Sequence, residues 1–404
     1  MPNLLRIAAV GCLALSVPAP AAKPQPERLA RLDTMLARYD AMKPGAARDA
    51  LAVEIDRFAG QRYATVSRLY WYQNLDDAKT AAAAQKRPIL HLRMLGRLDE
   101  DLSCANSRFF RTTLYSNTDT ARFLRDNFVL YWSSERPVPR VTIDFGDGRK
   151  IERTTTGNSA HYVMDERGRV LDVLPGLYAA PVFRKELAKS VDLARQVRGK
   201  PDAELLAAVL EFHRTELQAT YKQFAAVAGT NFIRRRGRLI GRAELGASAI
   251  ESAQRATFAK MAVEVPDLQK IGIDAGTIDP KDLAQWATIG QKVWDIGLDK
   301  PAKLVDAAST ALVETLRTGN PYKSSTQHTI ERLEQLVLAD TALNQFQLRP
   351  AIRRQLMALR TLDWETFDRW IYASVFRTPR TDVWLGLLES TDFTGLPADG
   401  VVMP

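Results

Sequence analysis

The chain has 404 residues, of which 46% are hydrophobic and 25% charged, an ordinary composition for a globular protein of two or three domains. Its net charge of +9 is spread along the sequence, and the one dense basic cluster, Arg234 to Arg242, contains no interleaved aromatic residues for base stacking, so nucleic acid is not expected as a partner. We interpret this cluster as the solvent-exposed face of a helix or loop. The alternative is that it binds an anionic partner other than nucleic acid.

The first 21 residues have the pattern of a secretory signal peptide. A weakly basic start, Met1 to Arg6, precedes the apolar run Ile7 to Val17, and Ala19-Pro20-Ala21 is typical of a cleavage site. The pattern predicts export to the periplasm or the extracellular space. Because Cys12 lies in this leader, the mature chain is expected to keep one thiol, Cys104, and to form no internal disulfide. No later apolar run is long enough to cross a membrane.

Residues 22–62 are expected to form short helices. Glu27 to Asp40 places apolar residues at helical spacing, Lys43-Pro44-Gly45 interrupts the pattern, and a second helix is predicted from Ala46 to Phe58. The following segment, Tyr63 to Tyr72, is rich in aromatic and β-branched residues, so we interpret it as a strand.

The segment 63–198 alternates strand and helix signals. Asn74 is predicted to cap a helix that ends at Lys86-Arg87-Pro88, because the residue before a proline avoids helical geometry. The further predicted elements are a strand over Ile89–Leu95, a helix over Cys104–Asn127, a strand over Phe128–Trp132, a hairpin over Arg140–Thr155, strands over His161–Met164 and Arg169–Leu174, and a helix over Ala180–Arg198. This order favours a mixed α/β sheet covered by helices.

Residues 199–404 show almost no strand signal and are predicted to form a separate all-helical domain. The predicted helices cover 203–228, 242–263, 282–294, 302–318, 325–344 and 350–362. A dense aromatic helix follows, with Trp364, Phe367, Trp370 and Phe376 at helical spacing. Such aromatic residues are typical of core or interface packing, because each buries a large area.

The segment from about Tyr63 to Ser190 resembles the thioredoxin-like superfamily in the order and spacing of its motifs. The strand PILHLRMLG (88–96) precedes the sequence CANS (104–107), and Phe128, in the strand DNFVLYW, lies 24 residues after Cys104. The sequence HYVMDERGRVLDVLPG (161–176) is similar to that fold's closing hairpin. The resemblance implies that Cys104 stands at the position of the attacking cysteine and Ser107 at that of the resolving cysteine.

The resemblance also implies a place for substrate. The family's cis-proline would stand near Ser159, yet GNSAH (157–161) contains no proline, so Ser159 and Ala160 are expected to line the place where a substrate backbone docks. The start of a helix favours a thiolate at Cys104, whereas the acidic run Asp99 to Asp101 opposes it.

Two functions follow as hypotheses. The first is an exported thioredoxin-like protein that carries out monothiol disulfide exchange, or binds a protein or small-thiol partner, through Cys104. The second is a non-catalytic interaction or scaffold protein of the cell envelope, in which Cys104 is a buried small hydrophobe of a degenerate site.

No metal or cofactor is expected. The four histidines, His91, His161, His213 and His328, are scattered, without the close pairing that a zinc or iron site needs.

Overall fold

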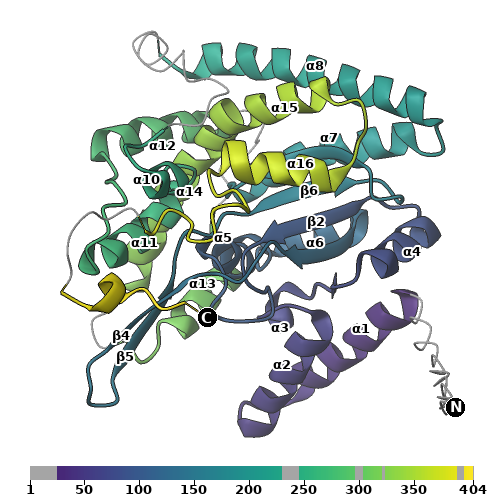
Figure 1. Cartoon of the computed structure of the whole chain (residues 1–404). Helices are drawn as coiled ribbons and strands as arrows, with labels where there is room; N and C mark the ends of the chain where they lie inside the picture. Colours follow the sequence, from purple (N-terminus) through teal and green to yellow (C-terminus); the bar gives the residue numbers. More distant parts are fainter. Residues whose placement is uncertain (1–24, 230–244, 296–303, 321–323, 389–394, 404) are drawn as a thin grey trace, which may run out of the picture.

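The computed structural model describes residues 25–229, 245–295, 304–320, 324–388 and 395–403 (Figure 1). The predicted leader and the basic cluster from Arg234 to Arg242 lie outside the described residues. Two antiparallel helices, α1 (Gln25–Ala41) and α2 (Ala46–Ala59), come first, in agreement with the sequence prediction for residues 22–62.

A five-stranded mixed sheet forms the centre of the fold, in the order β1-β3-β2-β6-β7. Its strands are β1 (Trp71–Tyr72), β2 (Ile89–Met94), β3 (Val129–Ser134), β6 (Ala160–Met164) and β7 (Val170–Pro175). The first three are mutually parallel, whereas β6 runs antiparallel to both β2 and β7. Every residue of β2, β6 and β7 is buried, so both faces of the sheet are covered. The prediction of a mixed sheet flanked by helices is confirmed.

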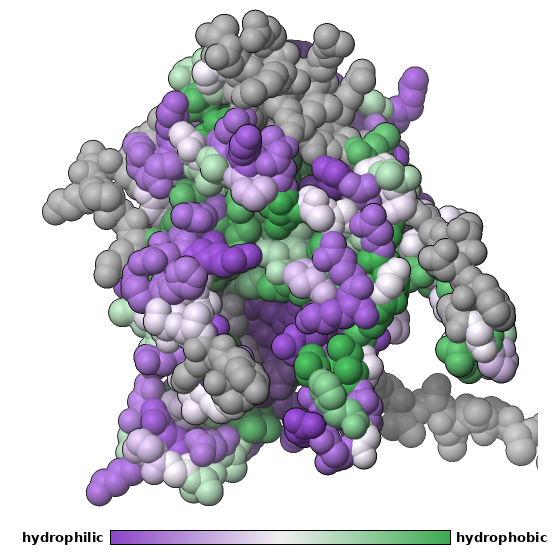
Figure 2. Space-filling model, turned by 90° about the vertical axis from the view of Figure 1, so that its left-hand side faces the viewer, coloured by the Kyte–Doolittle hydropathy of each residue, from purple (hydrophilic) through white to green (hydrophobic). Residues whose placement is uncertain are grey.

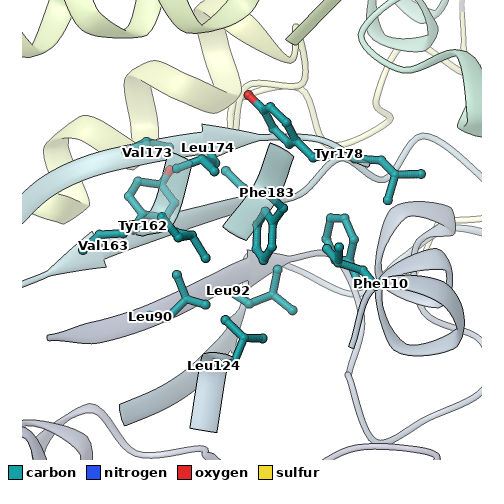
Figure 3. Close-up of a cluster of buried hydrophobic side chains, with 14 of the residues drawn as sticks. Leu90, Leu92, Phe110, Leu124, Tyr162, Val163, Val173, Leu174, Tyr178 and Phe183 are labelled. Atoms are coloured by element: carbon teal, nitrogen blue, oxygen red, sulfur yellow. The ribbon is translucent and has the colours of Figure 1, made fainter. Parts of the chain in front are cut away.

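One face of the sheet packs against α6 (Thr118–Asn127) and α7 (Ala180–Val197). Figure 3 shows Leu90 and Leu92 of β2 pointing toward Leu124 of α6 and Phe183 of α7. All four side chains are fully buried. This apolar layer holds the central strand in place, since burying each such side chain contributes about 1.5 to 3 kcal/mol.

The opposite face is covered by α16 (Trp364–Trp370), far away in the sequence. The contacts here are partly polar: the Tyr162 hydroxyl donates to Asp368 Oδ1 at 2.7 Å, and Arg93 Nε donates to Asp368 Oδ2 at 3.2 Å. His91 lies edge-on to Trp364, with ring centroids 4.8 Å apart. The C-terminal helices therefore meet the sheet directly.

The described residues of the second half of the chain form helices joined by loops and contain no named strand, which agrees with the predicted helical character. Its remaining α-helices are α8 (Asp202–Val227), α10 (Ala249–Gln254), α11 (Phe258–Lys270), α12 (Pro280–Asp295), α13 (Ala307–Leu316), α14 (Thr326–Leu343) and α15 (Arg349–Ala358). One contiguous cluster of buried side chains extends from Leu32 in α1 through the sheet to Leu385. The described helices thus pack on the sheet, and the domain boundary at residue 198 stays a prediction.

The predicted strand over Tyr63–Tyr72 is mostly wrong. Residues 64–67 form a short helix, α3 (Ala64–Ser67), and the strand is reduced to the two residues of β1. The buried Asp56 carboxylate accepts the Ala64 N–H at 2.8 Å and fixes this turn. A tertiary hydrogen bond here overrides the β-propensity of the local residues.

Two long predicted helices are interrupted. Cys104–Asn127 divides into α5 (Ala105–Phe109), a π-helical turn η1 (Phe110–Leu114) and α6, which Asn117 caps by accepting the Thr120 N–H at 3.0 Å. The helix predicted over 242–263 divides into α10 and α11, and Asp340 of α14 accepts two N–H groups at the start of α11. In both cases a side chain that accepts backbone N–H groups starts a new helix and so divides the predicted one.

The helix α4 (Leu75–Gln85) begins as predicted, since the Asn74 side chain accepts the Asp77 N–H at 3.0 Å. The predicted hairpin is also present, as β4 (Arg140–Asp144) and β5 (Lys150–Thr154), and it extends away from the body at the lower left of Figure 1. Figure 2 shows this end of the molecule, where hydrophilic and hydrophobic residues are interspersed among the coloured atoms.

A buried ion network fixes the helical half to the sheet. Arg349, at the start of α15, donates to Asp172 of β7 at 2.5 Å and also to Glu186 of α7, and all three side chains are at most 5% exposed. Burial alone would raise the carboxyl pKa values, but the guanidinium groups of Arg349 and Arg353 hold the pKa of Asp172 well below its usual range and lower that of Glu186 to about 2.

We predict that Arg349→Met lowers the free energy of unfolding by about 3 to 5 kcal/mol, because it removes the cation that bonds the fully buried Asp172 carboxylate and one of the cations that pair with Glu186. Arg195→Met, which removes a largely exposed ion pair with Asp192, should cost less than about 1 kcal/mol. Urea unfolding at pH 7 measures both.

The pH dependence follows from the low carboxyl pKa values. In the natural chain the contribution of Asp172 and Glu186 is present above their unfolded pKa values and is lost as the pH falls towards about 2. Arg349→Met should therefore weaken this acid dependence, and an unchanged stability at pH 7 would contradict the assignment.

Candidate functional site

Cys104 lies at the boundary between the loop after β2 and the first turn of α5. Its backbone is extended, with φ −58° and ψ 154°, and its carbonyl accepts the Arg108 N–H at 3.1 Å. The predicted placement, a sulfur at the start of a helix on the rim of a mixed sheet, is confirmed. The side chain, however, is fully buried at 0% exposure.

Three of the four predicted site residues meet at the sulfur. Cys104 Sγ lies 3.0 Å from the Ser159 hydroxyl oxygen and 3.4 Å from the Ser107 hydroxyl oxygen. Ser107 Oγ also donates to the Cys104 carbonyl at 2.8 Å. Ala160, the fourth, is the first residue of β6 and is buried opposite Arg93 of β2. The structure therefore brings together residues that the sequence separates by more than fifty positions.

The loop before β6 presses against the cysteine. At Gly157 a Cβ atom would lie 2.2 Å from Cys104 Cβ, so any side chain there would collide with the site. The described residues contain no cis peptide bond, so none precedes Ser159. Thr156 has φ 63°, a left-handed conformation that β-branched residues rarely adopt. Such strain persists only where neighbouring groups impose it.

The neighbouring group is α11, which closes over this loop. Glu264 Oε2 accepts the Thr156 N–H at 2.8 Å, and Lys260 Nζ donates to Asn158 Oδ1 at 3.0 Å. Both α11 side chains are at most 1% exposed. The helix thus covers the loop in which Ser159 would receive a substrate backbone.

The helix α10 completes this cover. Its last residue, Gln254, donates from Nε2 to Glu264 Oε2 at 2.7 Å, and the Ala253 carbonyl accepts Lys260 Nζ at 2.6 Å. Asn106, the second residue of α5, reaches Thr257 at the start of α11 at 3.5 Å. Polar contacts therefore join α10 and α11 to both the loop and the cysteine helix.

Burial shifts the pKa values of the titratable groups of α11 and of its capping residue. It lowers the pKa of Lys260 to about 8 and raises that of Glu264. The pKa of Asp340, which caps α11, is raised to about 8 by the same cause. A buried charge without a partner is energetically costly. The closed site therefore favours the neutral or hydrogen-bonded forms of Lys260, Glu264 and Asp340.

The acidic run that was expected to oppose a thiolate is engaged elsewhere. Asp101 pairs with Arg62 at 2.9 Å, and Asp99 pairs with Arg97 at 2.7 Å. A buried cation lies closer to the site: Arg111 Nη1 donates to Ser103 Oγ at 3.0 Å, and Ser103 Oγ lies 2.7 Å from Ser107 Oγ. Burial lowers the pKa of Arg111 to about 10.

Sequence reasoning missed the residues that close the site. Lys260 and Glu264 are four positions apart, a spacing that places them on one face of a helix, but this signal did not indicate what that face covers. The sequence did not indicate that Arg111 is buried, because its burial follows from the π-helical turn η1. The long-range packing of α11 is the missing information.

Three of the four histidines lie in the buried interior. His91, His161 and His213 are buried and bonded to Ser133, Tyr115 and the Leu171 carbonyl respectively. Among the described residues, no group of histidine, cysteine and acidic side chains could hold a metal ion.

Within the same residues, no helix is both long and apolar enough to span a membrane. Compared with known proteins, the chain matches no family model, no curated protein and no solved structure at a significant level.

We predict that Gly157→Ala destabilises the fold by about 1 to 3 kcal/mol, because its methyl group would overlap Cys104 Cβ. Cys104→Ala keeps that Cβ and should not relieve the clash, whereas Cys104→Gly should recover part of the loss. Thermal unfolding of the single and double variants measures this coupling. Equal losses in both double variants would contradict the contact.

Proposed function

We propose that this chain is an exported protein with a degenerate thioredoxin-like fold that binds partners without catalysing thiol exchange. Three features support the resemblance: β2 leads into the Cys104 turn, α5 begins there, and the β6–β7 hairpin closes the sheet next to the cysteine. In this proposal Cys104 is a small packing residue of the core.

One observation carries the proposal: the sulfur has no access to a reactant. Cys104 is 0% exposed, and α11 is bonded to the loop that faces it. Thiol–disulfide exchange requires the thiolate to attack a disulfide sulfur, so a sealed thiol is inert. In addition, Ser107 cannot act as a resolving thiol, and its hydroxyl already bonds to the Cys104 carbonyl.

A second candidate is monothiol exchange with a protein or small-thiol partner. The observation that favours it is electrostatic, since Cys104 begins α5, and the buried cations Lys260 and Arg111 lie in the same polar cluster. In that reaction the Cys104 thiolate attacks a disulfide, forms a mixed disulfide and releases one thiolate. A second, external thiol then releases the partner and restores Cys104. Both steps require α11 to leave the loop.

Alkylation separates the two candidates. We predict that iodoacetamide at pH 7 modifies Cys104 at least about a hundredfold more slowly than a free cysteine, because exposure needs a local opening that costs a few kcal/mol. Full modification should follow denaturation. Lys260→Met should accelerate labelling, since it removes the bond to Asn158, whereas Lys270→Met, at the exposed end of α11, should not.

Labelling of the native chain at the rate of a free thiol would contradict the proposal. Mixed disulfides that form with the natural protein and disappear in Cys104→Ser would favour the second candidate instead. Mass spectrometry of the intact protein detects both products.

A further inference from the structure

The side chains of Asn158, Lys260 and Glu264 form an enclosed group between the loop before β6 and the helix α11. Asn158 and Lys260 are 0% exposed, and Glu264 is 1% exposed. Lysine is almost never fully buried unless it is paired with an anion. In the described structure, however, Lys260 Nζ donates to two neutral oxygens, Asn158 Oδ1 at 3.0 Å and the Ala253 carbonyl at 2.6 Å. The amine is therefore held against an amide.

This contact places the amine next to the carbon of the Asn158 carboxamide. Because a C=O bond is about 1.2 Å long, a nitrogen 3.0 Å from Oδ1 lies no more than about 4.2 Å from Cγ. That limit is at most about 0.7 Å beyond the separation from which such atoms react, about 3.5 Å. The Ala253 carbonyl orients both groups, since it accepts Lys260 Nζ and also Asn158 Nδ2, the latter at 3.3 Å.

Burial makes this amine a better nucleophile. It lowers the pKa of Lys260 to about 8, so that about a tenth of the amine is uncharged at pH 7. Glu264, Cys104 and Asp340 act in the opposite direction and limit the decrease. A desolvated lysine with a free lone pair is a recognised way to activate a nitrogen nucleophile.

Glu264 is the carboxyl group best placed to carry a proton between the two nitrogens. It lies one helical turn after Lys260 on the same face of α11. Burial raises the pKa of Glu264, and the charge of Lys260 partly offsets this effect. Its Oε2 accepts from Thr156 and Gln254, whereas its Oε1 has no partner in the described structure. Asp340, by contrast, uses both oxygens to cap α11.

We propose that Lys260 and Asn158 form an intramolecular isopeptide bond. The lone pair of the uncharged Lys260 Nζ attacks Asn158 Cγ, the Nζ–Cγ bond forms, and the Cγ–Nδ2 bond breaks. Glu264 takes the proton that Nζ loses and gives it to Nδ2, which leaves as ammonia. The reaction needs no oxidant or reductant, because it exchanges a primary amide for a secondary amide.

The bond joins the loop before β6 to α11, two segments that are 102 positions apart in the sequence. It provides a covalent link in a chain that is expected to form no internal disulfide. The inference goes beyond the proposed function, which holds whether or not the bond forms, because hydrogen bonds already join α11 to this loop.

The mass of the intact, denatured full chain tests the proposal. The natural protein should be lighter by one ammonia molecule than its sequence requires, whereas Lys260→Met should show no such deficit. A protease digest of the natural protein should yield one branched peptide that contains both Asn158 and Lys260. This peptide distinguishes the isopeptide from a succinimide at Asn158, which also releases ammonia but leaves the two peptides apart.

Glu264→Gln and Lys270→Met form the informative pair of variants. Glutamine keeps an oxygen that can accept the Thr156 N–H but does not relay protons, so bond formation should slow at least about a hundredfold. Freshly purified Glu264→Gln should therefore keep its full mass while circular dichroism shows that it is folded. Lys270, at the exposed end of the same helix, pairs with Asp267, so Lys270→Met should show the natural deficit.

Three results would overturn the proposal. They are the full sequence mass for the folded natural chain, a deficit that persists in Lys260→Met, and separate peptides for residues 158 and 260. In the first case hydrogen bonds alone hold Lys260. Bond formation at the natural rate in Glu264→Gln would overturn the role given to Glu264.

Discussion

The contact between α11 and the loop at residues 155–159 decides what the cysteine can do. Glu264 holds the backbone N–H of Thr156, and Lys260 holds the side chain of Asn158. Both partners belong to the loop that touches Cys104 and leads into the central sheet. A segment from the helical half therefore completes the environment of a residue in the sheet half, and the thiol cannot be understood without it.

This closure depends on how the helical half is anchored. Arg349 ties α15 to β7 and α7, and Asp368 ties α16 to β2 and β6. Buried ion pairs add little net stability, but their loss is costly because a bare charge remains. They therefore hold α15 and α16 against the strands that they contact. Within this arrangement, Asp340 of α14 caps α11 and sets the position from which it covers the loop.

Much of the fold could be predicted from the sequence, because its signals are local. The strands at 161–164 and 169–174, the hairpin over 140–155 and the cap at Asn74 each depend on neighbouring residues, and each appears within a residue or two of its expected place. The failure at residues 63–72 has a cause outside that segment, the carboxylate of Asp56, which bonds the backbone N–H of Ala64. Local propensity is silent about such a contact.

The candidate site was predicted in part. Cys104, Ser107 and Ser159 meet as the resemblance implied, but the sequence left open whether Cys104 is reactive or buried, because its burial is decided by α11, more than a hundred residues away. The role of the loop in docking a partner stays a prediction. In the described structure this place is occupied by side chains of the chain itself.

Amide hydrogen exchange at Thr156 tests the closure most directly, because this N–H donates to the Glu264 carboxylate. The account predicts slow exchange that persists until α10 and α11 themselves become unprotected, and faster exchange in Glu264→Ala. Exchange of Thr156 at the rate of an unstructured peptide in the native protein would show that the loop is open, and would contradict the sealed site.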